Sequence, residues 1–250
     1  MPRTARVALL ALLLPLRARG QSEPPPQDLT AIELEQLMET RVTSVTKREQ
    51  TVANAAQAIT VITQEEIRRS GVETLADALR LAPGLDVAQI SSNQWAVSAR
   101  GFNGRFANKL LVLIDGRTVY TPLFSGVFWE DQDTLLEDVE RIEVIRGPGA
   151  AIWGANAVNG VVNVITKRAG QTQGLLAAAG GGSHDRAFGR VRWGGVLSPW
   201  TSYRVYLKGF ARDAFEDAAG NDAGDRWREA RGGFRLDWAR GAPPRRGGRR

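Results

Sequence analysis

Residues 149–154 form a glycine-rich loop whose spacing could bind a phosphate group. Its outer glycines, Gly149 and Gly154, are separated as in a phosphate-binding P-loop. A P-loop needs a lysine and then a serine or threonine at the next two positions, where they reach the phosphates and magnesium. Ala155 and Asn156 stand there instead. Tight turns and close backbone packing therefore explain the glycines better.

The same loop departs from the dinucleotide-binding fingerprint. Ile152 occupies the third glycine position of that pattern, and no acidic residue occurs between Gly149 and Asp185 to bind a ribose. Two apolar runs, residues 139–145 and 161–165, flank the loop and are predicted to be strands. A nucleotide-binding enzyme is therefore only a distant alternative.

The strand before the loop carries charges. Arg141 and Glu143 are two residues apart, so they share one face of the strand, and Arg146 lies just past its end. Charges on so apolar a strand indicate contact with a wet or charged wall. A solvated sheet face is an equally good explanation from these residues alone.

The composition excludes several classes of site. The chain has no cysteine, so it has neither disulfides nor thiolate metal sites, and its one histidine, His184, cannot make a histidine-rich centre. The net charge is +6. Much of that excess comes from residues 240–250, which hold five arginines and no acid. A basic nucleic-acid face is therefore not required.

The first 20 residues are predicted to be a secretory signal peptide. Arg3 and Arg6 precede an apolar run at residues 7–14, and Ala18 and Gly20 offer small residues near a cleavage site. The apolar run is too short to span a bilayer as a helix. A buried N-terminal helix is the alternative. Export of a cysteine-free chain suits a bacterial envelope protein.

Residues 21–54 are predicted to be a linker with a short β-prone segment. That segment has no strand partner nearby in the sequence, and an unpaired extended segment can add itself to the sheet edge of another protein. An ordinary edge strand or linker is the simpler explanation. The segment consists of Val42, Thr43, Ser44, Val45 and Thr46.

Residues 55–168 are predicted to form a compact α/β domain. Thr63 and Glu66 form a capping box for a helix that ends at Gly71, and Thr74 starts a second helix. The predicted strands are residues 59–62, 85–90, 95–100, 110–114, 139–145 and 161–165.

From residue 169 to residue 240 the pattern changes to long alternating strands. Strands of about ten residues, apolar on one face and charged on the other, are typical of a transmembrane β-barrel. Trp193, Trp200 and Trp238 suit the aromatic girdles of such a barrel. A soluble antiparallel sheet with one solvated face is the alternative.

Four stretches together resemble the plug domain of TonB-dependent outer-membrane receptors, the family of siderophore and cobalamin transporters. The fold class that this resemblance implies is an α+β plug, a small mixed sheet with short helices, followed by the start of an antiparallel transmembrane β-barrel. The stretches are ITVITQEEIRRSG (59–71), TLADALRLAPGLDV (74–87), SARGFNGRFANKLLVLIDGRTVY (98–120) and VERIEVIRGPGAAIWGANAVNGVVNVITK (139–167).

The resemblance implies ligand-gated, energy-coupled uptake of a ferric siderophore, cobalamin or similar scarce nutrient, without catalytic residues, cofactor or metal site. The implied partners are that ligand, outer-membrane lipid and the TonB protein, which would bind residues 42–46. The implied ligand contacts at the plug apices are Trp95, Asn103, Phe124 and Ser125. The residues implied to face the barrel wall are Arg100, Glu143 and Arg146.

Only about four barrel strands can be counted before residues 241–250, a tail that resembles no strand. So few strands cannot close a barrel, and their edges would stay unpaired. We therefore expect a truncated, frameshifted or partial product that does not transport alone. The main alternative function is a free periplasmic plug that sequesters ligand or TonB.

Overall fold

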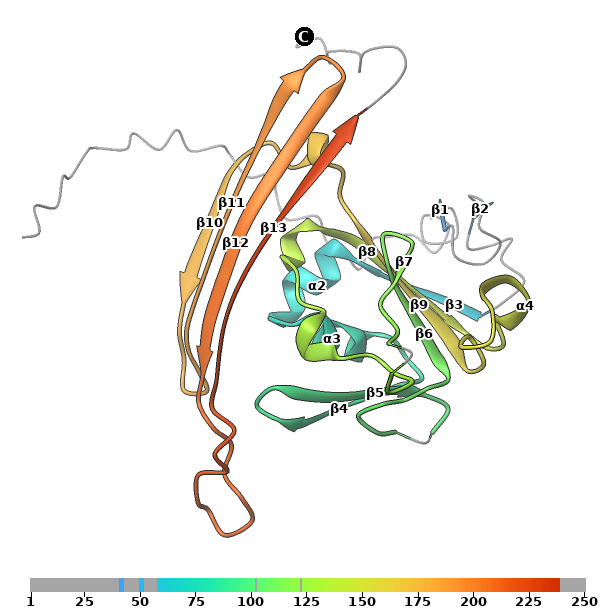
Figure 1. The fold of residues 1–250 in the computed structure, drawn as a ribbon, viewed down its shortest axis with the longest axis vertical. Coiled ribbons are helices and arrows are strands. Elements are labelled where there is room, and N and C mark those ends of the chain that lie inside the picture. Colours follow the sequence, from blue (N-terminus) through green and yellow to red (C-terminus); the bar gives the residue numbers. More distant parts are fainter. Residues whose placement is uncertain (1–40, 43–49, 52–57, 102, 122, 239–250) are drawn as a thin grey trace, which may run out of the picture.

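The computed structural model describes residues 41–42, 50–51, 58–101, 103–121 and 123–238. A mixed five-stranded sheet forms the centre of the plug (Figure 1). In it β6 and β9 run parallel, and the other neighbours are antiparallel. The strand order is β3 (Ala58–Thr63), β8 (Val139–Arg146), β9 (Gly160–Thr166), β6 (Leu110–Ile114) and β7 (Arg117–Thr118).

Short helices connect these strands, and their predicted caps are confirmed. The backbone N–H of Glu66 donates to Thr63 Oγ1 at 3.3 Å, and the N–H of Thr63 donates back to the Glu66 carboxylate at 2.7 Å. Gly71 ends the helix with φ of 70°, a conformation that glycine adopts without strain. The helices are α2 (Gln64–Ser70), α3 (Leu75–Ala78), α4 (Ala150–Trp153), η3 (Leu79–Leu81), η4 (Trp129–Asp131), η5 (Leu136–Asp138) and η6 (Ala169–Gln171).

A separate hairpin, β4 (Leu85–Ser91) and β5 (Gln94–Ala99), lies at the lower end of the plug in Figure 1. One face of the central sheet packs on α2, α3 and this hairpin, and it buries Ile142, Val144 and Val162. The opposite face has a smaller cluster that includes Leu111 and Val161. Adjacent residues of a strand thus enter two different cores, as a period of two requires.

The glycine-rich loop joins β8 to β9, which are antiparallel neighbours, and its helix α4 has only four residues. A Cβ atom on Gly160 would lie 2.5 Å from the carbonyl oxygen of Ile145. Close backbone packing therefore accounts for this glycine.

A second, four-stranded sheet stands beside the plug (Figure 1). Its strands follow each other in sequence order, and every pair is antiparallel. A tight turn joins β11 to β12, while residues 213–226 form a long loop before β13. The strands are β10 (Gly174–Gly180), β11 (Asp185–Ser198), β12 (Thr201–Arg212) and β13 (Trp227–Trp238).

The alternation predicted for these strands is confirmed. The apolar face points away from the plug: Phe234 is 82% exposed and Trp238 67% exposed. On the other face Arg204 and Lys208 are only 5% exposed. Among the described residues, none forms a helix with both the length and the apolar character needed to cross a membrane.

The segment before the plug differs from expectation at Val42. β1 (Arg41–Val42) pairs with β2 (Gln50–Thr51), and Val42 is fully buried. The prediction that this segment has no strand partner nearby is therefore wrong at its first residue, because the chain returns within a few residues. Thr43, Ser44, Val45 and Thr46 lie outside the described residues.

Candidate functional site

The plug and the four-stranded sheet meet along a set of ion pairs that we call the charged seam. The cations project from alternate positions of the strands, where the strand period places them on the face toward the plug. The carboxylates come from the plug. The pairs are Arg190 with Glu73 and Glu137, Arg192 and Arg204 with Asp138, Lys208 with Asp133, and Arg235 with Asp115.

Asp138 is the most deeply buried carboxylate of the charged seam, at 1% exposed. It ends η5, and its carboxylate accepts from Arg192 Nη1 at 2.5 Å and lies 3.4 Å from Arg204 Nε. Burial lowers the pKa of nearby Lys167, and the charge of Asp138 partly opposes that shift. An acid this enclosed depends on its two arginines, because an unpaired buried charge is costly.

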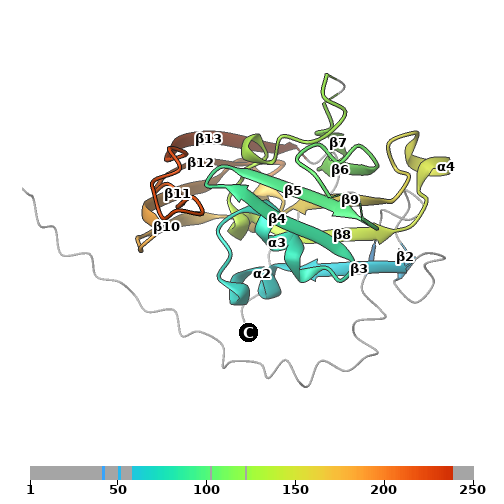
Figure 2. The same cartoon turned by 90° about the horizontal axis from the view of Figure 1, so that it is seen from below.

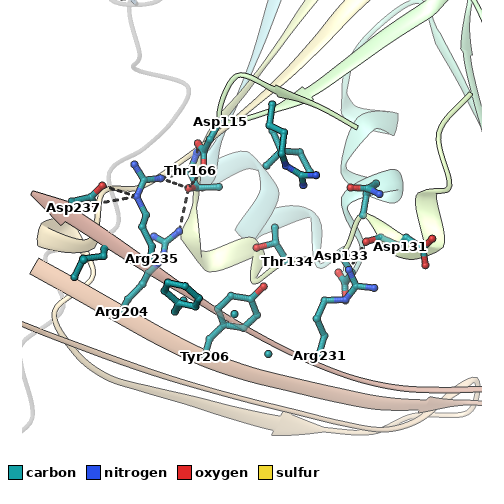
Figure 3. Close-up of a pocket in the computed structure, with 17 residues that line it drawn as sticks. Asp115, Asp131, Asp133, Thr134, Thr166, Arg204, Tyr206, Arg231, Arg235 and Asp237 are labelled. Carbon is teal, nitrogen blue, oxygen red and sulfur yellow. Dashed lines mark hydrogen bonds and ion pairs between the residues drawn. The ribbon is translucent and has the colours of Figure 1, made fainter. Parts of the chain in front are cut away.

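A cavity of about 680 Å³ opens between the plug and strands β12 and β13 (Figure 3). At one side Asp115 accepts from the backbone N–H and the hydroxyl of Thr166, at 2.8 and 2.7 Å, and from Arg235 at 3.1 Å. Arg235 also donates to Asp237 at 3.0 Å. This network ties the turn between β6 and β7 to the last described strand.

The cavity walls balance their charges. Arg235 pairs with Asp115 of the plug, whereas Arg231 pairs with Glu229 of its own strand and donates to the backbone carbonyl of Asp131. With four cations and four anions, the cavity suits water and polar, uncharged groups better than a highly charged ion. The charged residues that line it are Arg117, Arg204, Arg231, Arg235, Asp115, Asp131, Asp133 and Asp237.

A second candidate site is an aromatic cluster on the loops at residues 101–109 and 121–131. Phe106 stacks on Phe124 with ring centroids 5.4 Å apart, and Phe128 meets both rings edge-on at 5.2 and 5.3 Å. Arg105 lies 5.1 Å from the Phe106 centroid and pairs with Glu130 at 2.6 Å. We call this cluster the ligand end. It can offer aromatic faces and one guanidinium to a ligand.

Three of the four predicted ligand residues lie on these loops. Phe124 is 49% exposed within the cluster, and Ser125 beside it adopts φ of 53°. Asn103 is exposed on the other loop. Phe106 and Phe128 were not predicted from the sequence as ligand contacts, although both lie in glycine-containing loops together with these three predicted residues.

Trp95 lies elsewhere and corrects the expectation of an open apical contact. It is 2% exposed on β5, its indole N–H donates to Asp77 at 3.3 Å, and its ring lies 6.3 Å from that of Trp227. A large amphipathic ring gains more from this buried contact with the sheet than from exposure.

Three residues were predicted to face the barrel wall: Arg100, Glu143 and Arg146. They are not among the ion pairs named above for the charged seam. Glu143 is fully buried and pairs with Arg141 at 2.8 Å on its own strand. Arg100 is exposed with φ of 62°, and a Cβ atom on Gly84 would lie 3.2 Å from Cδ of Arg146. Their contact with a barrel wall stays a prediction. The acids that form the charged seam are instead Glu73, Asp115, Asp133, Glu137 and Asp138.

The sequence and the fold of this chain are similar to those of known proteins. Residues 51–161 match the model of the TonB-dependent Receptor Plug Domain. The chain is 33% identical over 150 residues to the vitamin B12 transporter BtuB of Vibrio vulnificus, covering 59% of this chain and 24% of that relative. It is 35% identical over 185 residues to the ferric enterobactin receptor of Pseudomonas aeruginosa, covering 63% and 24%.

The chain thus spans about a quarter of the length of these curated relatives. Their names describe a transporter and a receptor, not enzymes. Among solved structures, the ferric yersiniabactin uptake receptor FyuA of Yersinia pestis has the same fold, with a TM-score of 0.58 at 23% identity over 79% of this chain and 31% of that one. Residues 51–161 therefore carry the plug domain of the TonB-dependent receptors, and an antiparallel sheet follows it in the chain.

Proposed function

We propose that this chain supplies the plug and first wall strands of an outer-membrane receptor for TonB-dependent, ligand-gated uptake of a scarce nutrient, a ferric siderophore or a corrinoid. In this proposal residues 1–20 direct export, residues 21–54 link the plug to the energy-coupling complex, and residues 55–168 are the plug. Residues 169–240 begin the barrel wall, and residues 241–250 are a tail outside it.

The observation that carries the proposal is the four-stranded sheet with its buried charged face and its exposed apolar face. In water a sheet buries its apolar face, since that burial is the main driving force of folding. Here Arg192 and Arg204 are enclosed against the plug while Phe234 and Trp238 face outward. That arrangement is stable where the surroundings are lipid and the interior is polar.

The ligand end supports the ligand class. Three phenylalanine rings present flat apolar faces there, beside the Arg105 guanidinium, whose charge Glu130 balances. Aromatic faces suit the planar groups of a siderophore or a corrinoid. The two ligands named among the relatives, vitamin B12 and ferric enterobactin, are the natural first probes.

The experiment is equilibrium binding of vitamin B12 and of ferric enterobactin to the full chain refolded in detergent, followed by tryptophan fluorescence. We expect saturable binding of one probe, weakened about tenfold by Phe124→Ala, since an aromatic contact and its buried area are lost. Leu123→Ala, at an exposed neighbouring position (80%), is the matched control. Absence of saturable binding of either probe would count against the ligand class.

Coupling to TonB has its own test. Val45→Pro removes a backbone N–H that an added strand would use, at a position other than Val42, which already pairs with β2. We expect it to reduce capture of the chain by the C-terminal domain of TonB, and equal capture would argue against residues 42–46 as the binding segment. Cell fractionation tests the alternative function, a free periplasmic plug, because such a protein would not appear in the membrane fraction.

A further inference from the structure

The long loop at residues 213–226 is fastened to the tip of hairpin β4–β5. The backbone N–H of Ser92 donates to Asp225 Oδ2 at 2.7 Å, and the Ser92 hydroxyl donates to the carbonyl of Asp225. The second carboxylate oxygen of Asp225 accepts from the N–H of Phe215 at 2.8 Å. Ser92 is fully buried by this contact. One carboxylate therefore joins the plug to both ends of the loop.

An aromatic cluster holds the neighbouring strand ends against the same hairpin. Trp227, just after the loop, lies 6.3 Å from Trp95 of β5 and meets Phe210 edge-on at 4.7 Å. The guanidinium of Arg212 covers the Phe210 ring at 4.7 Å and donates to Asp185 at 2.6 Å. The base of the loop is thus fixed to the hairpin by packing as well as by hydrogen bonds.

The rest of the loop is held together internally. Asp217 Oδ1 accepts from the N–H groups of Ala219 and Asn221 at 2.8 and 2.9 Å. The N–H of Ala223 donates to the carbonyl of Phe215 at 2.8 Å. These bonds fold the loop back on itself between Phe215 and Ala223.

The hairpin connects this attachment to the ligand end. β5 leads directly into residues 101–109, which carry Phe106 of the ligand end. Figure 1 shows the hairpin and the long loop toward the same end of the molecule. One strand, β5, and one carboxylate, that of Asp225, therefore connect the ligand end to the loop.

We propose that Asp225 is a positioning residue that couples the loop at residues 213–226 to hairpin β4–β5, so that ligand binding at the ligand end tightens the attachment of the loop, and the attached loop strengthens ligand binding. The coupling is reciprocal by thermodynamic necessity. It rests on the proposed function for its ligand, while the attachment itself can be tested without one. Hydrogen bonds from the backbone of Ser92 lower the pKa of Asp225, so the carboxylate is charged at neutral pH.

The ligand-free test is amide hydrogen exchange on the full chain in detergent. The carboxylate of Asp225 accepts from the backbone N–H groups of Ser92 and Phe215. Asp225→Asn replaces it with an uncharged amide that has a single acceptor oxygen. We expect exchange at Ser92 and through the hairpin to become about tenfold faster, because hydrogen bonds to a charged group are lost. The matched control is Asp222→Asn, whose carboxylate accepts from Gly224 within the same loop. Unchanged hairpin exchange in Asp225→Asn, or equal acceleration in the control, would overturn the coupling.

The ligand-bound test uses whichever of vitamin B12 and ferric enterobactin the wild-type chain binds. The probe should slow exchange in residues 213–226 of the wild type but not of Asp225→Asn, whose affinity should fall at least fivefold. If Asp225→Asn fails to fold, Ser92→Ala, which removes only the hydroxyl bond, gives a smaller effect of the same sign. Wild-type affinity and loop ordering in a folded variant would refute the inference. If neither probe binds the wild type, the proposed function loses its support, and the ligand-free exchange still decides the coupling.

Discussion

The plug and the four-stranded sheet use the same strand alternation with opposite results. In the plug, Ile142 and Val162 are fully buried apolar residues of the central strands. In the sheet, Lys208 and Arg212 are buried at 5% and 6% exposure, and Leu207, the neighbour of Lys208 in the strand, is 57% exposed. The plug buries its apolar residues, as a protein in water does. The sheet buries its charged residues and exposes its apolar ones.

The difference teaches that the period of a strand fixes which residues share a face, but not which face is buried. The plug carries apolar residues toward its own helices. The sheet turns its charges toward the plug because the plug offers carboxylates such as Asp138 and Asp133. The plug therefore supplies the carboxylates, and the sheet the cations, of the ion pairs between them.

The largest effect should come from removing the central carboxylate of the charged seam. Asp138→Ala leaves Arg192 and Arg204 buried without their partner, and we expect a loss of about 3–5 kcal/mol in the free energy of unfolding. Urea unfolding of the detergent-refolded chain, followed by tryptophan fluorescence, measures it. Adding Arg192→Met should restore part of the loss, because one uncompensated charge is then removed.

Glu140→Ala is the control for this change. Glu140 is 38% exposed and pairs with Arg141 on the plug surface, so its removal should cost about 0–1 kcal/mol. Equal losses in the two variants would mean that the charged seam is no more than a set of surface ion pairs.

A charge on the exposed apolar face should have a large effect in lipid alone. Leu207 lies near the middle of β12, and Leu207→Arg should cost about 2–4 kcal/mol in a bilayer. In water the same exposed position should tolerate it within about 0.5 kcal/mol. Unfolding from lipid vesicles measures the first value, and unfolding in lipid-free buffer the second.

Val196→Arg provides a depth control, because Val196 is 61% exposed but lies near the end of β11, where it pairs with Ser202. Its cost in the bilayer should fall to about 0–1 kcal/mol. If Leu207→Arg costs no more in lipid than in water, the apolar face does not meet the membrane.

Local signals in the sequence were sufficient for most of the fold. Thr63, Glu66 and Gly71 act within one or two turns of chain, so their cap geometry could be predicted from spacing alone. The six predicted plug strands all form, within about two residues of their expected ends. The charged and apolar faces of β11 to β13 also follow from alternation.

The candidate site was less predictable, because its contacts join residues far apart in the chain. Trp95 has the residue type of a ligand contact, and only the packing of Trp227 shows that it is enclosed. Asp138 and Arg204 meet across 66 positions, and no local pattern pairs them. The signal available was the complementarity of basic strands and the acidic stretch at residues 133–138.

The smallest effect we predict is the pH dependence of order in the loop at residues 213–226. Asp213, Asp217 and Asp225 all have pKa values below the usual range for an aspartate, mainly because of hydrogen bonds from Arg186, Asn221 and Ser92 respectively. A lowered folded-state pKa adds stability that is complete above the unfolded pKa of about 3.9 and is lost as the pH falls through the folded value. The loop should therefore stay ordered to about pH 4 and loosen below it.

Because the chain lacks cysteine, Ala218→Cys labels the loop at a single exposed site. The anisotropy of the attached dye should be constant from pH 7 to about pH 4 and fall below that. Asp225→Asn should start lower and change less, since one of the responding carboxylates is absent. A transition near neutral pH would instead contradict the prediction, because carboxylates with lowered pKa values do not titrate there. The order of the loop would then depend on groups other than these three carboxylates, and its attachment through Asp225 would not be what positions it.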